Sequence, residues 1–520
     1  MPAATGSNLR VYRATSFRKG LNRKQSSFNL ARGRPNEWLT LANNVVYTTS
    51  GGVAKRFDVA IYNSTNLGAT VGITGGIEFR RSNGTNQIIV GTDDGRIVQL
   101  NTDGTTTNLL TGLTTGRRWS FAIYADVLLC CNGADAPRSW NGTAMSTLGG
   151  TPPATGSVVA VHQNRVFMLD ETQLSRLSFS ALNNQADWTT ANDAGSISVY
   201  PNDGQGLTGI VPFGNEMILQ KPSHVYRLQG TAPAAGYTIT SVVPAPQITG
   251  GVSFQALLAA VNNVWLLSRD GIHSIQTVQE FGDLKQAFTS EPIAPRFEPF
   301  GDFEVSLNRL NLAVGVYDRQ HGRLYFAVDT NNNSQNDLLL AYDLFTGGWS
   351  EWPAFTGGIG SMWTVQNPTN GRAEIFAGGY DGSVRVLNRS VGTNTISGDV
   401  RHISDLGAAT VEKSPRHAYF YFTEQGNWNV TVTTRFDFGF TGGQTYTVSQ
   451  LAGSRTLGVD WTLGTDPLGR LDVIRRRVDL RGTGEFLEMG VSNAAAGQPF
   501  NWLGYEVLWR HRRAVGRGAA

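Results

Sequence analysis

The chain has 520 residues, of which 40% are hydrophobic and 16% are charged, and its formal net charge at pH 7 is +3. This hydrophobic content is sufficient for buried cores and excludes a disordered chain. The sequence has no heptad run and no collagen-like Gly period, which excludes fibrous classes. At about 100–200 residues per domain, the length predicts two to four domains.

The sequence has no segment typical of secretion or of a membrane anchor. The first 20 residues lack the apolar stretch of a secretory signal. The longest apolar run, residues 122–131, is interrupted by Asp126 and is shorter than the roughly 20 residues of a spanning helix. The two cysteines, Cys130 and Cys131, are adjacent and point to opposite faces of a strand, which excludes a disulfide framework. We therefore expect folding in a reducing cytosol.

Basic residues are concentrated at the two ends of the chain. Residues 1–60 contain ten Lys or Arg and two acids, a net charge of +8, and residues 465–520 have a net charge of +3. The intervening residues 61–464 therefore have a net charge of −8. A basic N-terminal arm on an acidic body suits contact with an acidic partner surface, although a basic run is often only a solvated segment. The C-terminal tail is also basic, with Arg510, Arg512, Arg513 and Arg517.

Hairpins dominate the middle of the chain. Short runs rich in Val, Ile, Tyr, Phe, Trp and Thr alternate with Gly, Asn and Asp, the pattern of strands separated by turns. An Asx-Gly pair supplies the positive φ values that a tight hairpin turn requires. The clearest such turns are Asp93-Asp94-Gly95, Asn101-Thr102-Asp103-Gly104, Asp270-Gly271 and Asp381-Gly382.

These hairpins form a loose repeat. Each copy is an apolar strand, a polar turn and a second apolar strand, and successive copies begin about 40–60 residues apart. The clear copies are residues 87–100, 264–275 and 374–387, and the weaker ones are residues 127–140, 165–178, 217–228 and 324–344. This spacing is typical of four-stranded propeller blades.

We therefore predict an all-β fold with three parts. Residues 70–395 form a β-propeller of six or seven blades, because radial packing of small sheets buries both faces of each sheet. The alternative is a β-sandwich or a chain of sandwiches. Residues 396–520 form a second, sandwich-like β domain, since residues 416–436 alternate apolar and polar over a long stretch. Residues 1–69 form a basic arm and strands that join this C-terminal platform.

The sequence has no recognisable catalytic, cofactor-binding or metal-binding motif. The G-x-S-x-G elbow and the Walker loop are absent. The glycine pairs Gly358/Gly360 and Gly482/Gly484 lack the third glycine of a dinucleotide-binding turn. No linear pattern selects a pair of carboxylates for glycoside hydrolysis. We therefore predict no enzymatic activity, no cofactor and no metal site. The seven histidines, none of which has zinc-site spacing, are His162, His224, His273, His321, His402, His417 and His511.

One polar loop has side-chain oxygens at alternate positions, as in calcium-binding loops. They belong to Asp329, Asn331, Asn333 and Asp337. The sixth position of the loop is Ser334 instead of Gly and the twelfth is Leu340 instead of Glu, which departs from the EF-hand pattern. A long hairpin tip explains the same residues, so calcium binding stays the alternative.

Several phrases resemble the tail nozzle proteins of short-tailed phages, the tail tubular protein B type. The first lies in residues 16–56, and the second, in residues 164–188, is an Asn-Arg-Val-Phe strand followed by a hairpin and Asp-Trp. The others are residues 214–228, the hairpin near Asp270, and the ending Pro499-Phe500 with Leu503-Gly504-Tyr505. Together they span most of the chain. The motifs of the first phrase are Gly20-Leu21-Asn22, Asn44-Val45, Gly51-Gly52 and Lys55-Arg56.

The resemblance implies a structural virion protein with a propeller. Such proteins form a hexameric ring at the distal end of the tail, below an adaptor protein, and carry or neighbour tail fibres. Their channel holds the phage DNA until ejection. The implied partners are thus further copies of the chain, the tail adaptor, tail fibres or other tail proteins, and DNA in transit. The implied location is the virion tail, after assembly in the host cytoplasm. The polar hairpin at residues 331–337 is a candidate for a gating loop.

Two other functions remain open from the sequence. One is a receptor- or glycan-binding propeller on a virion surface, with or without glycan cleavage. The other is a monomeric intracellular scaffold.

Overall fold

The computed structural model describes residues 9–33, 36–232, 234–242, 250–277, 284–298, 305–367, 370–387, 395–408, 410–439, 441–450 and 473–512. Arg513 and Arg517 of the basic tail lie outside the described residues. The chain forms two compact units. The propeller unit comprises Val59–Leu340 and Pro353–Leu387, and the sandwich unit comprises Met1–Asp58, Ala341–Trp352 and Asn388–Ala520.

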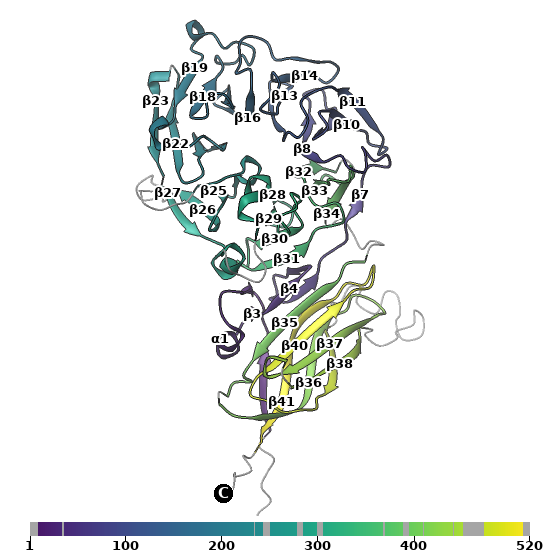
Figure 1. The fold of residues 1–520 in the computed structure, drawn as a ribbon. Helices are drawn as coiled ribbons and strands as arrows, with labels where there is room; N and C mark the ends of the chain where they lie inside the picture. Colours follow the sequence, from purple (N-terminus) through teal and green to yellow (C-terminus); the bar gives the residue numbers. More distant parts are fainter. Residues whose placement is uncertain are drawn as a thin grey trace, which may run out of the picture. The chain divides into compact units, whose positions relative to one another are not determined.

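The propeller unit is built from small antiparallel sheets, which follow one another around a ring in Figure 1. Five blades each consist of four consecutive strands. The first two are β8 (Ile73–Arg80), β9 (Asn86–Thr92), β10 (Ile97–Leu100), β11 (Thr106–Leu110), and β12 (Ser120–Tyr124), β13 (Val127–Cys131), β14 (Arg138–Trp140), β15 (Met145–Thr147). The third is β16 (Gly156–His162), β17 (Arg165–Asp170), β18 (Arg176–Phe179), β19 (Gly195–Ser198). The next two are β20 (Gly209–Phe213), β21 (Glu216–Gln220), β22 (Val225–Gly230), β23 (Tyr237–Ser241), and β24 (Leu258–Ala260), β25 (Asn263–Ser268), β26 (Gly271–Thr277), β27 (Leu284–Phe288).

Two further blades complete the ring within the described residues. In the sixth, β28 (Val314–Asp318), β29 (Arg323–Val328) and β30 (Leu338–Asp343) are successive neighbours of one sheet. The seventh combines β32 (Ser361–Gln366), β33 (Ala373–Gly378) and β34 (Val384–Leu387) with β7 (Ala60–Ile61) from the N-terminal part of the chain. All seven predicted hairpins are confirmed, and each forms the second and third strands of a blade. The predicted propeller fold is therefore confirmed, with seven blades.

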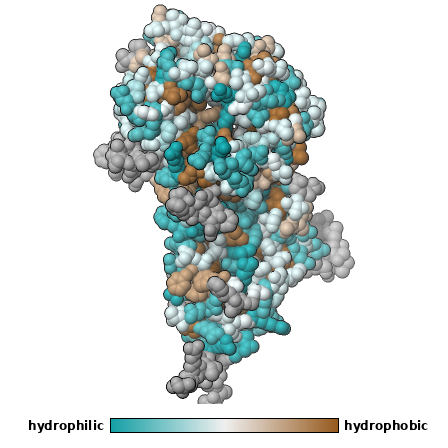
Figure 2. Space-filling model, viewed as in Figure 1, coloured by the Kyte–Doolittle hydropathy of each residue, from teal (hydrophilic) through white to brown (hydrophobic). Residues whose placement is uncertain are grey.

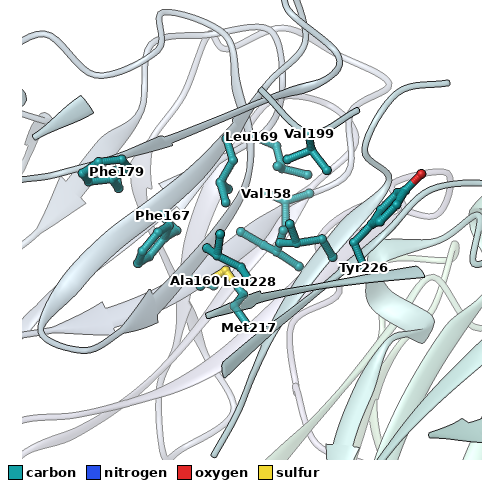
Figure 3. Packing of buried hydrophobic residues seen from close by; sticks show 12 residues of the cluster. Val158, Ala160, Phe167, Leu169, Phe179, Val199, Met217, Tyr226 and Leu228 are labelled. Atoms are coloured by element: carbon teal, nitrogen blue, oxygen red, sulfur yellow. The ribbon is translucent and has the colours of Figure 1, made fainter. Parts of the chain in front are cut away.

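Within the propeller unit, hydrophobic clusters lie between neighbouring blades. In Figure 3, Phe167 and Leu169 of the third blade pack with Met217 and Leu228 of the fourth. A similar cluster joins the seventh blade to the first, where Trp363 and neighbouring apolar residues pack against β8 and β9. A blade exposes apolar side chains on both faces, so each blade needs a neighbour on either side, and ring closure supplies the last pair.

The first and last parts of the propeller unit are joined by hydrogen bonds. β7 pairs antiparallel with β34, with Ala60 opposite Val386. The buried Asn63 accepts a hydrogen bond at Oδ1 from the backbone N–H of Val384 (2.7 Å) and donates from Nδ2 to Gly382 O (3.1 Å). The two-residue strand β7 and the side chain of Asn63 thus connect the N-terminal segment to the last blade by hydrogen bonds.

The sandwich unit contains two sheets (Figure 1). One has the order β39-β36-β41-β6-β5, with β1 also pairing β41. The other runs β4-β35-β40-β37-β38. The strands of the first are β1 (Arg10–Ala14), β5 (Val45–Tyr47), β6 (Val53–Lys55), β36 (Lys413–Thr423), β39 (Val473–Asp479), β41 (Asn501–His511). Those of the second are β4 (Leu41–Asn43), β35 (Gly398–Ser404), β37 (Asn429–Phe436), β38 (Thr441–Ser449), β40 (Leu487–Asn493).

Aromatic side chains fill the space between these two sheets. Trp502 and Tyr505 of β41 are buried, and Phe17 packs on Trp502 with ring centroids 4.5 Å apart. His402 of β35 is fully buried, and its Nδ1 lies 2.8 Å from Tyr505 Oη. Desolvation lowers the pKa of His402 to about 4. The imidazole is therefore a neutral hydrogen-bonding group of the core at physiological pH.

The remaining elements are short. The sandwich unit also contains β2 (Gly20–Leu21), β3 (Trp38–Leu39), the helix α1 (Ser27–Arg32) and all but the last residue of β31 (Trp349–Pro353). The 3-10 helices are η1 (Thr190–Asn192), η2 (Pro201–Asp203), η3 (Ala234–Gly236), η4 (Phe254–Ala256), η5 (Glu291–Phe297), η6 (Leu307–Leu312), η7 (Asp437–Gly439). Cys130 and Cys131 are buried free thiols. Within the described part of the chain, no helix has the length and apolar character needed to cross a membrane.

Candidate functional site

The axis of the propeller is surrounded by the first strand of each blade. These strands lie at one end of their sheets, and each contacts the first strands of the adjacent blades, from β8 through β32 and back to β8. Only one side of each first strand is paired within its blade. Backbone groups and side chains of these strands therefore line the axis, where propellers commonly place ligands or water.

A cavity of about 780 Å³ lies on this axis, within the size range of small-molecule sites. It is lined by residues of β8, β24, β28, β32 and β33, of the turn after β28 and of the segment before β33. The polar lining includes Glu78, Arg80, Arg319 and Gln366, and Met362 contributes apolar surface. Figure 2 shows hydrophilic and hydrophobic residues interspersed over the visible face of the molecule.

The carboxylate of this cavity is engaged by neighbouring donors. Glu78 Oε2 lies 3.0 Å from Arg80 Nε, and Glu78 Oε1 accepts hydrogen bonds from Asn86 Nδ2 (2.5 Å) and Gln366 N (3.0 Å). Glu78 is the single carboxylate among the described lining residues, whereas glycoside hydrolysis requires two. Arg319 is exposed. The cavity is therefore suited to hold a polar or anionic group and offers no acid–base pair.

At the other end of β8, the arginine Arg118 bridges residues from distant blades. It precedes β12, and its guanidinium donates to Gln255 Oε1 and to the carbonyl of Asn311. Weaker contacts reach Ser253 Oγ (3.4 Å) and Ala313 O (3.5 Å). These acceptors come from the segments that begin the fifth and sixth blades. The guanidinium thus joins the second blade to the opposite part of the ring.

The network around Arg118 continues through neighbouring side chains. Gln255 Nε2 donates to Thr74 O (2.7 Å) and Trp119 O (3.1 Å), while Ser253 Oγ donates to Ala313 O (2.7 Å). Desolvation lowers the pKa of Arg118 to about 10. At neutral pH Arg118 is still a cation, and within the described residues its hydrogen-bond acceptors are neutral.

In the candidate calcium loop, side-chain oxygens of Asp329, Asn333 and Asp337 accept hydrogen bonds from the loop itself. Asp329 accepts from the N–H groups of Asn331 (2.9 Å) and Ser334 (2.8 Å). Asp337 accepts from the N–H and hydroxyl of Thr330, both at 2.6 Å, and from Asn331 Nδ2. Asn333 Oδ1 accepts from Gln335 N. The alternating oxygens of this loop are therefore explained by turn formation, since Asp and Asn side chains commonly accept hydrogen bonds from the backbone of their own turn.

The histidines are distributed over both units and are not gathered at one site. His273 pairs with Asp270 (2.9 Å), His321 with Asp318 (2.7 Å), and His417 with Asp479 (2.7 Å). Among the described residues, no three or more His, Cys, Asp or Glu side chains are placed together to hold a metal ion.

Sequence reasoning missed the axial residues. Arg118 and Gln255 are separated by 137 positions, and the acceptor in Asn311 lies 193 positions from Arg118. Neither arginine nor glutamine belongs to a recognisable local motif there. These residues come together only when the ring of blades closes. The sequence could have indicated only that residues just before the first strand of a blade lie near the propeller axis.

The chain matches no family model and no curated protein. Among solved structures, it is similar to the BT4673 extracellular domain from B. thetaiotaomicron, with 16% identity and a TM-score of 0.43 over 72% of this chain and 45% of that one. It is also similar to YCF48 from Cyanidioschyzon merolae, with 12% identity and a TM-score of 0.41 over 63% and 98% of the two chains. A third similar structure is BamB from Moraxella catarrhalis, with 13% identity and a TM-score of 0.36 over 66% of this chain and 90% of that one. The chain thus spans less than half the length of the first of these structures.

Proposed function

We propose that this protein is a structural component of a short phage tail, the ring-forming nozzle. The proposal rests on the sequence resemblance described above and on the places that its motif residues occupy. In this role the protein has no enzymatic activity. Copies of the chain form a hexameric ring that docks to an adaptor and to tail fibres, and the ring retains DNA until ejection.

The single observation that carries the proposal is that the N-terminal motifs form structural joints. Gly20 has a φ of +74°, and a Cβ there would lie 2.7 Å from Gly348 Cα. Asn44, with a φ of 52°, donates from Nδ2 to Ser397 O (2.9 Å) and accepts from Arg56 Nε (2.8 Å). Lys55 Nζ donates to Ala495 O (2.8 Å). Asn44 and Lys55 thus connect the start of the chain to its C-terminal part, and Gly20 packs against the residue before β31. These contacts support an architectural role for the resembling phrase.

Charge is compatible with this role. The propeller unit has 18 Lys or Arg and 24 Asp or Glu, a net charge of −6, whereas the sandwich unit has 25 and 16, a net charge of +9. An acidic surface repels DNA phosphates and limits adhesion during passage. A basic unit is suited to docking on acidic neighbours.

Negative-stain imaging of the purified protein mixed with neighbouring tail components tests the proposal. We expect rings of six copies that form only in the mixture, because tail proteins often assemble on their neighbours. A protein that stays monomeric with every tail component, or that is absent from purified virions by mass spectrometry, would contradict the proposal.

A second candidate function is favoured by the axial cavity. Its size and its mixture of arginine, amide and apolar lining fit a small polar or anionic ligand, as in a receptor- or glycan-binding propeller. Screening on a glycan array that includes acidic sugars tests this function. Binding that is lost in Arg319→Ala would favour it over the structural role, and the absence of any glycan signal would exclude it for the sugars tested. The monomeric scaffold has no observation of its own in its favour.

A further inference from the structure

Two first strands that line the axial cavity run in the same direction along the propeller axis. Ser361 Oγ of β32 donates to Ile73 O of β8 (2.8 Å). Five residues further along both strands, Gln366 N donates to Glu78 Oε1 (3.0 Å). β8 and β32 therefore advance side by side, and the position of a residue along such a strand indicates how far along the axis it lies.

The Arg118 network lies where the first strands begin. Thr74 is the second residue of β8, Ala313 directly precedes β28, and Ser253 lies ahead of β24. The cavity residues of β8, β24 and β28 come later in these strands, beginning with Glu78, Leu258 and Gly315. The cavity thus lies beyond the network, toward the ends of the first strands.

Apolar side chains line the part of the cavity nearest the network. They belong to Leu258 of β24, Val316 of β28 and Met362 of β32, and we call them the apolar end. Val316 and Met362 are 6% and 8% exposed. A Cβ at Gly315 would lie 2.9 Å from Leu258 Cδ1, so this glycine leaves room for the leucine. Because the apolar end is built from three neighbouring blades, an apolar group between them is removed from water.

Polar side chains line the opposite part of the cavity, which we call the polar end. Its carboxylate, Glu78, is paired with Arg80 (3.0 Å). The second arginine, Arg319, is exposed, and the described lining has no second carboxylate to neutralise it. The adjacent Asp318 is buried and faces His321 (2.7 Å). The polar end therefore has a net positive charge. Its remaining polar side chains are Tyr317, Gln320, Thr364 and Gln366.

We propose that the axial cavity binds a small carboxylate with an apolar body of several carbons. The carboxylate meets the guanidinium of Arg319, which can hold both oxygens, and the body reaches the apolar end. Met362 and Gln366 are four residues apart on β32, a span of about 13 Å that accommodates an extended chain of about eight carbons. A single uncompensated cation does not favour a polyanion such as a nucleic acid. The inference rests on the second candidate function, ligand binding in this cavity, and is independent of the tail role.

A series of aliphatic acids tests the proposal on the full-length protein without any variant. Butanoate, hexanoate and octanoate are titrated by isothermal calorimetry. Each added methylene that reaches the apolar end should tighten binding by about fourfold. Octanamide, which has the same chain without the charge, should bind at least about fivefold more weakly than octanoate. Equal affinity across the three acids, equal affinity of octanoate and octanamide, or no saturable binding of any acid would overturn the proposal.

A variant then tests the place of the carboxylate. Arg319→Gln should weaken octanoate binding by about fivefold or more and leave octanamide binding unchanged. The matched control is Arg117→Gln, because Arg117 is exposed and lies near the start of β12, beside the Arg118 network. The control should bind octanoate as the unchanged protein does. Circular dichroism checks that both variants are folded. Unchanged octanoate binding in Arg319→Gln would overturn the assigned orientation.

The acids and the glycan array separate this inference from the second candidate function. A glycan signal that is lost in Arg319→Ala, without binding of any of the three acids, would leave that function standing and overturn the inference. Saturable octanoate binding with the expected dependence on chain length, without any glycan signal, would support the inference and exclude the sugars tested as ligands.

Discussion

Replacement of Arg118 by methionine tests whether the axial network holds the ring of blades together. Methionine keeps an unbranched stem of similar length and removes the guanidinium. The lost contacts are those to Gln255 Oε1 and Asn311 O and the weaker ones to Ser253 and Ala313. Because these acceptors belong to blades far along the chain, their loss should weaken the propeller unit without affecting the sandwich unit.

The expected magnitude follows from which acceptors remain satisfied. Ser253 Oγ still donates to Ala313 O, and Gln255 Nε2 still donates to Thr74 O. Asn311 is exposed, so water replaces the donor at its carbonyl. The main loss is the charge-assisted bond to Gln255, and such bonds contribute about 1.5–3 kcal/mol. We therefore expect Arg118→Met to lower the free energy of unfolding of the propeller unit by about 2–3 kcal/mol.

Denaturant unfolding followed by tryptophan fluorescence measures this change. Trp119, adjacent to Arg118, is buried and donates from Nε1 to Thr92 O (3.0 Å), so its emission reports on the propeller. The matched control is Arg117→Met, since Arg117 is exposed and contacts the network through its backbone carbonyl. The control should change the free energy of unfolding by less than about 0.5 kcal/mol. An equally small effect of Arg118→Met would refute the bridging role.

Three further predictions concern the core and the closure of the ring. The free energy of unfolding of the sandwich unit should keep its full value above pH 6.5 and fall by about 3 kcal/mol toward pH 4. The reason is that burial lowers the pKa of His402 to about 4, while the unfolded chain binds the proton near 6.5. Thermal unfolding across this range should show a smaller loss for His402→Gln. Gly20→Ala should cost more than about 2 kcal/mol in denaturant unfolding, since a Cβ there meets backbone at 2.7 Å with a φ of +74°, whereas Gly84→Ala, with φ of +85° and open space, should cost about 1 kcal/mol. Asn63→Ala leaves the buried N–H of Val384 without its acceptor and should cost about 1–3 kcal/mol; faster limited proteolysis next to β7 checks this, and an unchanged cleavage rate would count against closure by Asn63.

The hairpins were predictable because their signals are local. Gly95, Gly104 and Gly382 all adopt positive φ values in turns between adjacent strands. A two-strand unit with an Asx-Gly turn needs no distant partner to be recognised. The outermost strands are harder to predict, since β11 and β15 are short and largely polar. The repeat therefore predicted the architecture, with six or seven blades, more securely than the individual strands.

The axial site could not be predicted in the same way. The cavity combines Glu78 of the first blade with Arg319, which lies far along the chain after β28. Neither residue has a distinctive local context. In the loop containing Asp329 and Asp337, by contrast, a visible pattern of oxygens is accounted for by hydrogen bonds within the turn. Local patterns thus identified turns, whereas the candidate site depends on closure of the ring.

The N-terminal segment contributes to both compact units. β4, β5 and β6 belong to the sheets of the sandwich unit, and β7, a few residues later, completes the last blade of the propeller unit. Because β7 has only two residues, its pairing with β34 cannot be stable by itself and depends on neighbouring contacts such as those of Asn63. The chain therefore cannot close its propeller until the residues made last in that unit meet a segment made before the first blade. Assembly of the ring of blades is for this reason a long-range event, coupled through a few residues to the segment that also builds the sandwich.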